Sequence, residues 1–143
     1  GGSNGGLLMG VALTQRPELW IAGVEAYGMA ALVQDFELGR DRFLDWYETQ
    51  MGNPKTDAAL FHERSPINFL DRLKAPLLIF QGAHDTNVPA AESELIYKKL
   101  KERGVPAQLI VYPDEGHGFT KRKNRTDYYR RTVDFFIQHC RER

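Results

Sequence analysis

Three residues whose types could perform nucleophilic catalysis lie in short glycine-rich or turn-rich segments. Ser3 is central in Gly1-Gly2-Ser3-Asn4-Gly5, Asp85 follows an apolar run, and His117 stands in Gly116-His117-Gly118. A serine hydroxyl is a poor nucleophile until a neutral imidazole accepts its proton. A carboxylate must in turn hold that imidazole in the correct tautomer. The three residues therefore form a candidate Ser-His-Asp triad.

The segment around Ser3 has the Gly-x-Ser-x-Gly pattern of a sharp turn from strand to helix, the nucleophile elbow. The glycines two residues to either side lack the β-carbons that would block such a tight turn. The backbone N–H of Asn4, directly after the serine, could then donate to an oxyanion. Taken alone, the pattern also fits a flexible linker or an expression scar, and the downstream segments favour the elbow.

Alternating helices and strands are predicted to position these residues. We expect strands over residues 20–27, 75–82 and 107–112, and helices over about 4–14, within 30–49, between 89 and 104, and over about 125–139. A turn at 51–54 and a short helix or turn from Ser65 complete the order. This alternation predicts an α/β fold with a parallel sheet and helices on both faces. Asp85 and His117 then follow strand ends, where ligands gather in such sheets.

Two predicted helices have an apolar stripe. For the helix between 89 and 104 we expect the interior side chains to be Ala91, Leu95, Tyr97 and Leu100. For the last helix we expect a core stripe of Tyr129, Val133, Phe136, Ile137 and Cys140.

Other titratable residues compete for the same roles. His84 precedes the candidate acid in one loop, where the acid must point at another ring, so we interpret His84 as structural. Asp114 and Glu115 could replace the acid, but they share the histidine's own loop and are too close to brace it from behind. His62 and His139 lie in polar, helix-like surroundings and are interpreted as solvated.

Composition excludes several functional classes. The 143 residues suit one domain, and 19 basic and 19 acidic residues give a net charge of zero. We therefore expect no nucleic-acid binding, and the absence of a long apolar run predicts no membrane span. Cys140 is the single cysteine, which fits a reducing, cytoplasmic location, although a signal peptide could precede Gly1. No cluster has metal-ligand spacing, so neither metal nor cofactor is expected.

The chain resembles the prolyl oligopeptidase family of serine peptidases, which includes acylaminoacyl and dipeptidyl peptidases. The matching stretches are residues 1–6, 65–68, 76–89 and 112–119. The resemblance implies that residues 1–143 are the C-terminal portion of an α/β-hydrolase catalytic domain, starting at the nucleophile elbow. It also implies that Ser3, Asp85 and His117 are the triad.

The resemblance further implies a peptide substrate, a missing N-terminal part with the rest of the hydrolase domain and a β-propeller, and a possible homo-oligomer. Asn87 stands where prolyl oligopeptidases and acylaminoacyl peptidases usually carry an arginine that holds a substrate carbonyl. Its amide could donate one hydrogen bond to that carbonyl, or Asn87 could be a plain turn residue. Residues 28–32 lack the aromatic side chains of a proline pocket, so the sequence leaves open whether cleavage follows proline.

Three functions follow from these observations. The first is a peptidase that cleaves short peptides or blocked N-terminal residues through an acyl-enzyme. The second is a stand-alone carboxylesterase acting on small esters. The third is that the 143 residues, in isolation, form an inactive folding or association module, because the second oxyanion donor of such folds comes from a loop upstream of the elbow.

Overall fold

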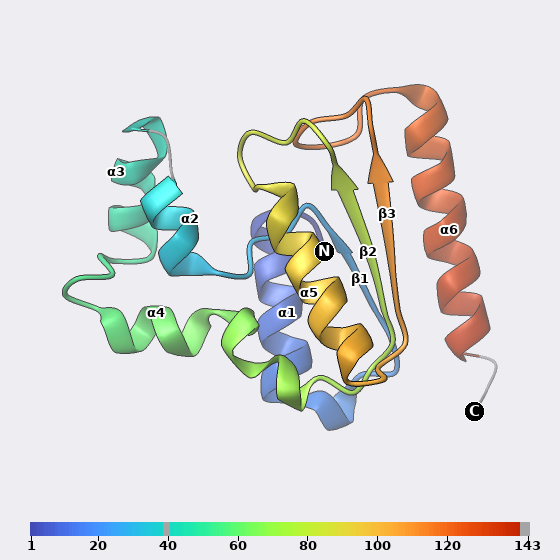
Figure 1. Ribbon diagram of the computed structural model, residues 1–143, viewed down its shortest axis with the longest axis horizontal. Coiled ribbons are helices and arrows are strands. Elements are labelled where there is room, and N and C mark those ends of the chain that lie inside the picture. Colours follow the sequence, from blue (N-terminus) through green and yellow to red (C-terminus); the bar gives the residue numbers. More distant parts are fainter. Residues whose placement is uncertain (39–40, 141–143) are drawn as a thin grey trace.

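A three-stranded parallel sheet organises the computed structural model, which describes residues 1–38 and 41–140 (Figure 1). Its strands are β1 (Gly23–Ala26), β2 (Leu77–Gly82) and β3 (Ala107–Tyr112), in the order β1-β2-β3. Ala26 pairs with Phe80, and Gly82 pairs with Tyr112. Because every pair is parallel, the carboxyl ends of the three strands meet at one edge.

Helices cover both faces of this sheet (Figure 1). On one face lie α1 (Asn4–Gln15) and α5 (Ala90–Glu102), and on the other lies α6 (Arg122–Cys140). Side chains of β2 alternate between two cores, as a strand requires. Leu77 and Ile79 pack with residues of α1 and α5, whereas Leu78 and Phe80 pack with Phe135 of α6. The predicted parallel sheet with helices on both faces is confirmed.

The chain between β1 and β2 forms a small helical unit to one side of the sheet (Figure 1). It contains α2 (Leu32–Leu38), α3 (Asp41–Gln50), α4 (Ala58–Arg64) and the 3₁₀ segment η2 (Pro66–Arg72); another, η1 (Pro17–Leu19), precedes β1. Tyr47 and Phe61 are buried here against Leu7 of α1 and Val88 of the loop before α5. The helical unit therefore shares its core with the elbow helix and with the loop after β2.

Most predicted elements are confirmed, with two local errors. The first strand is shorter than residues 20–27, and α4 lies where no helix was predicted. Phe61 is the buried residue of α4, and a seven-residue helix with one buried side chain is too short to show an apolar periodicity.

The predicted interior face of α5 was partly wrong. Ala91 and Leu95 are exposed, and the helix instead buries four side chains at helical spacing: Glu92, Ser93, Ile96 and Leu100. Two of these are polar and are buried because they make hydrogen bonds. Glu92 Oε2 accepts from the backbone N–H groups of Ala30 and Ala31, at 3.1 and 3.2 Å, and Ser93 donates to Gln81.

The predicted core stripe of α6 was wrong as well. Every member is exposed: Tyr129, Val133, Phe136, Ile137 and Cys140. The helix packs on the sheet through Tyr128 and Phe135, with the Tyr128 ring 4.8 Å from that of Phe80. Among the described residues, no helix has the length and apolarity to cross a membrane.

A pair of buried carboxyl groups joins the helical unit to α5. Asp35 of α2 and Glu92 of α5 are both buried, and two carboxyl groups can share a hydrogen bond only if one of them carries a proton. Burial, followed by the hydrogen bond to Glu92 and its charge, raises the pKa of Asp35 to about 9. Asp35 is therefore the protonated partner at neutral pH.

This raised pKa predicts a pH dependence of stability. Between pH 4 and 9 the folded state keeps a proton on Asp35 that the unfolded state releases, so stability falls as pH rises through this window. Asp35→Asn keeps a donor toward Glu92 without titrating. We expect its thermal midpoint at pH 8 to exceed that of the wild type by roughly 3–6 °C and the gap to shrink toward pH 4. Calorimetry from pH 4 to 9 measures it, with exposed Asp134→Asn as the control. A thermal midpoint that changes with pH in the same way in the wild type and in Asp35→Asn would contradict the shared proton.

Candidate active site

The segment bearing Ser3 is attached to the carboxyl end of β1. Ala26 donates its backbone N–H to Gly1 O at 2.9 Å, and Ser3 donates to Ala26 O at 3.0 Å. Gly2 and Ala26 form a parallel bridge, and α1 starts immediately after Ser3. Ser3 has φ 53° and ψ −124°, in the sparsely populated region that a sharp strand-to-helix turn imposes. The local backbone therefore has the geometry expected of a nucleophile elbow.

Close backbone approaches explain only part of the glycine pattern. A β-carbon on Gly1 would lie 2.2 Å from Gly5 O, and one on Gly6 would lie 2.6 Å from the Cα atom of Gly28. A β-carbon on Gly5 would meet nothing within 4 Å. The expectation of a steric need is thus confirmed at Gly1 and wrong at Gly5, and Gly6 takes its place.

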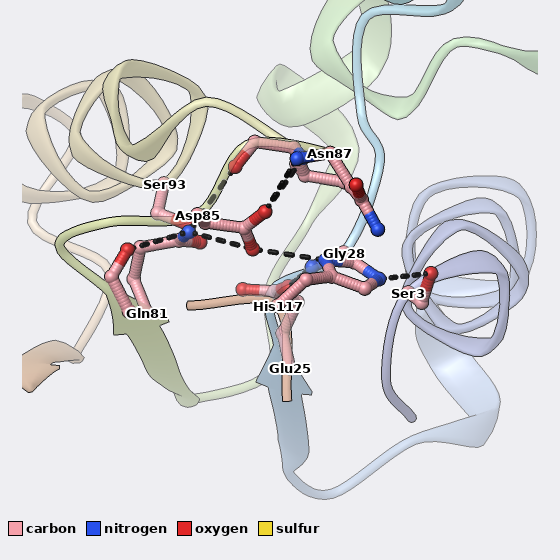
Figure 2. A network of polar contacts seen from close by, with 10 residues as sticks. Ser3, Glu25, Gly28, Gln81, Asp85, Asn87, Ser93 and His117 are labelled. Atoms are coloured by element: carbon pink, nitrogen blue, oxygen red, sulfur yellow. Dashed lines mark hydrogen bonds and ion pairs between the residues drawn. The ribbon is translucent and has the colours of Figure 1, made fainter. Parts of the chain in front are cut away.

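The structure brings Ser3, His117 and Asp85 into one chain of hydrogen bonds (Figure 2). The distance from His117 Nε2 to Ser3 Oγ is 2.8 Å, and that from His117 Nδ1 to Asp85 Oδ2 is 2.9 Å. Each residue follows a strand end or lies on the elbow beside one. In this arrangement the imidazole can accept the proton of the serine while the carboxylate fixes its tautomer.

Asp85 is held from several sides. Its Oδ1 atom accepts from the backbone N–H groups of Asn87 and Val88, at 2.8 and 2.9 Å. Burial acts to raise the pKa of this carboxyl, but the hydrogen bonds from His117, Val88 and Asn87 outweigh it and hold the pKa below its ordinary value. Asp85 is therefore an anion in the folded protein at neutral pH, although its side chain is fully buried.

A buried network behind Asp85 was missed from the sequence. Gln81, at the end of β2, donates from Nε2 to Asp85 Oδ2 and to the carbonyl oxygen of Val88, both at 3.2 Å. Ser93 Oγ of α5 donates to Gln81 Oε1 at 2.8 Å. Figure 2 shows this line of contacts from Ser93 to Ser3. The available signal was a glutamine in an otherwise apolar strand, one residue before Gly82.

The loop that carries His117 is folded around Glu115. This buried carboxylate accepts from both the N–H and the hydroxyl of Thr120, from Lys121 N and from Asn124 Nδ2, at 2.9 to 3.1 Å. Asp114 accepts hydrogen bonds from the side chains of Lys121 and Asn124. Both rival acids therefore organise the loop instead of contacting the imidazole.

The other histidines lie elsewhere in the fold. His84 and His62 are exposed, and the His62 ring packs edge-on against Phe69 at 5.4 Å. His139 packs against Phe135 at 4.5 Å. Within residues 1–38 and 41–140, no group of three or more His, Cys, Asp or Glu side chains could hold a metal ion.

Two further predicted site residues lie beside the triad. Asn4 is the first residue of α1, so its N–H is one of those at a helix start that have no intrahelical acceptor. Asn87 is exposed next to Asp85, where its backbone N–H supports the carboxylate (Figure 2).

The sequence matches known peptidases over nearly its whole length. The model of the prolyl oligopeptidase family matches residues 1–143. The chain belongs to this family. Among its relatives, dipeptidyl aminopeptidase BIII of Pseudoxanthomonas mexicana is 36% identical over 143 residues, covering 96% of this chain and 21% of the relative. Dipeptidyl peptidase family member 6 of Caenorhabditis elegans is 34% identical, covering 98% of this chain and 20% of the relative.

Solved structures of peptidases share the fold. An acylaminoacyl peptidase in complex with Z-Gly-Gly-Phe-chloromethyl ketone superposes with a TM-score of 0.83 at 25% identity, covering 94% of this chain and 22% of that one. A puromycin-hydrolyzing peptidase of Mycobacterium tuberculosis superposes with a TM-score of 0.78 at 29% identity, covering 83% and 18%. The α/β-hydrolase fold is thereby confirmed. The chain spans about a fifth of the length of the curated relatives it matches.

Removing the Gln81 amide tests whether the network behind Asp85 supports the triad. Gln81→Leu removes one donor to Asp85 and leaves Ser93 and the Val88 carbonyl without their partner. We expect the rate at which Ser3 reacts with a fluorophosphonate to fall by up to about 100-fold, because Asp85 would no longer hold the imidazole of His117 in the orientation that accepts the proton. The unfolding free energy should fall by about 1–3 kcal/mol.

The matched control is Gln108→Leu, the same change at an exposed position of β3. Labelling rates are followed by mass spectrometry. Equal rates in the two variants would show that Gln81 has no influence on the triad.

Proposed function

We propose that the protein containing these residues is a serine peptidase that cleaves short peptides or blocked N-terminal residues through an acyl-enzyme. The observation that carries the proposal is the unbroken chain of hydrogen bonds from Ser3 Oγ through His117 to Asp85, on a strained elbow. Membership of the prolyl oligopeptidase family supports it.

The geometry suits two acyl-transfer steps. In the first, Ser3 Oγ attacks the substrate carbonyl carbon while His117 Nε2 takes its proton, and Asp85 stabilises the imidazolium. The backbone N–H of Asn4 donates to the oxyanion. When the tetrahedral intermediate collapses, His117 gives that proton to the leaving amine, and an ester to Ser3 remains. In the second step His117 takes a proton from water, hydroxide adds to the ester carbon, and Ser3 Oγ leaves with the proton.

Asn87 is proposed as a substrate-binding residue. The exposure of Asn87 and its backbone hydrogen bond to Asp85 support this proposal. An amide N–H there could donate to a carbonyl of the bound peptide, with one uncharged hydrogen bond in place of the arginine found in some relatives.

Residues 1–143 are proposed to be the C-terminal portion of a larger catalytic domain, preceded by the rest of the hydrolase fold and by a β-propeller. The fivefold greater length of the curated relatives supports this arrangement. The exposed apolar stripe of α6 supports it too, because such a stripe is typical of a surface that another segment covers. Cytoplasmic location and homo-oligomer formation belong to the same proposal.

Labelling of the full-length protein with a fluorophosphonate tests the catalytic assignment. We expect one labelled site, lost in Ser3→Ala because the nucleophile is gone. Asp85→Asn should lower kcat on the order of 10⁴-fold, since the imidazole would adopt the wrong tautomer. Equal labelling of wild type and Ser3→Ala would remove Ser3 as the nucleophile. Acyl-amino-acid, dipeptidyl and simple ester substrates, compared by kcat/KM, then distinguish a peptidase from a carboxylesterase.

The 143 residues alone should be nearly inactive and should associate. A missing oxyanion donor costs about 3 kcal/mol of transition-state stabilisation, and an uncovered sheet edge and apolar helix stripe favour self-association. Size-exclusion chromatography with light scattering, together with the labelling rate, measures both properties. Rapid hydrolysis by a monomer of these residues would contradict the proposal.

A further inference from the structure

Tyr27 has an unusual backbone beside the candidate triad. Within residues 1–38 and 41–140, the non-glycine residues with positive φ are Ser3 at 53° and Tyr27 at 42°. A bulky side chain rarely adopts this left-handed region, and it persists only where neighbouring contacts impose it. Here the contacts are hydrogen bonds donated by the backbone N–H groups of Tyr27 and Gly28. Tyr27 N donates to Phe80 O at 2.8 Å, and the N–H of Gly28 donates to the buried carboxylate of Glu25.

The consequence of this backbone is the position of the phenol ring. Its centroid lies 5.0 Å from that of the His117 imidazole, with 63° between the ring planes, and 5.1 Å from that of Phe119. The ring also lies against the elbow, since a β-carbon on Gly2 would lie 3.1 Å from Tyr27 Cε2. The half-buried ring therefore lies beside both the residue before the nucleophile and the imidazole.

This contact restrains a motion that the hydrogen bonds of His117 leave free. The bonds at Nδ1 and Nε2 define an axis through the imidazole, and the ring can still tilt about that axis without breaking either one. Tyr27 packs against the imidazole from the side and opposes that tilt. During the reaction a proton moves from Ser3 Oγ to His117 Nε2 and then to the leaving group. The plane of the imidazole therefore sets the direction of both transfers.

We infer that Tyr27 is a positioning residue for His117, acting through its ring and not through its hydroxyl. The inference rests on the proposed function, because it concerns the same imidazole. It also explains why a left-handed tyrosine stands at the end of β1: this conformation directs the side chain toward Gly2 and His117.

Three substitutions in the full-length protein separate ring, hydroxyl and backbone. Tyr27→Phe keeps the ring, whereas Tyr27→Gly removes the ring and tolerates positive φ without strain. We expect kcat of Tyr27→Phe within about twofold of wild type, and kcat of Tyr27→Gly lowered by about 10–100-fold with little change in KM, as a misoriented base requires. Tyr27→Asn, which also tolerates this backbone, should match the glycine variant. Phe69→Ala removes a ring that is half-buried like that of Tyr27 but packs on His62 and Arg72, and it serves as the control.

A spectroscopic measurement distinguishes positioning from a general loss of stability. The low-field proton NMR signal of His117 Nδ1–H, hydrogen-bonded to Asp85, should persist in Tyr27→Phe and broaden in Tyr27→Gly and Tyr27→Asn. A wild-type kcat in the folded glycine or asparagine variant, or an unchanged low-field signal with a fallen kcat, would overturn the inference. Absence of fluorophosphonate labelling in the wild type would instead remove the proposed function itself.

Discussion

The attachment of residues 1–3 to the end of β1 is the constraint on which the rest of the site depends. Two backbone hydrogen bonds, Ala26 N to Gly1 O and Ser3 N to Ala26 O, fix where the serine stands relative to the sheet. Because β2 and β3 continue in parallel register, their ends then deliver Asp85 and His117 to the same edge. Ser3 and His117 are separated by 114 positions in the chain, yet Ser3 Oγ and His117 Nε2 lie 2.8 Å apart because the sheet positions both residues.

Buried polar side chains hold the loops at this edge. Gln81 supports Asp85, Glu115 closes the histidine loop, and Glu92 receives the backbone N–H groups that follow β1. A buried polar group without partners destabilises a fold. Each of these side chains therefore favours the loop conformation that supplies its hydrogen-bond partners. Hydrophobic burial packs the helices on the sheet, whereas these hydrogen bonds determine the conformation of the loops at its edge. Glu25 shows the cost of such burial, which raises its pKa to about 8 even though Gly28 donates a hydrogen bond to it.

The sequence predicted well what depends on local pattern. The apolar run before Gly82 and the Gly-x-Ser-x-Gly turn each specify their own structure, and the parallel sheet follows from their order. It predicted poorly what depends on which partner a side chain meets. Leu95 was assigned to the core because apolar side chains usually are buried, but Glu92 and Ser93 occupy that face through hydrogen bonds to residues far away in the chain. Gln81 and Tyr27 were missed for the same reason, since neither type of residue signals a catalytic neighbour.

Two residues at the site, Ser3 and Tyr27, have a positive φ. Each such backbone costs of order 1–3 kcal/mol, so an isolated occurrence would be lost unless other contacts imposed it. Ser3 is imposed by the turn from the end of β1 into α1, and Tyr27 by its hydrogen bond to β2. Both distortions thus depend on the stability of one sheet. Both residues also contact the His117 imidazole, Ser3 through a hydrogen bond to Nε2 and Tyr27 through its ring. A relaxed backbone at either position would move a group that contacts this imidazole, so the sheet edge, more than any single side chain, maintains the geometry of the site.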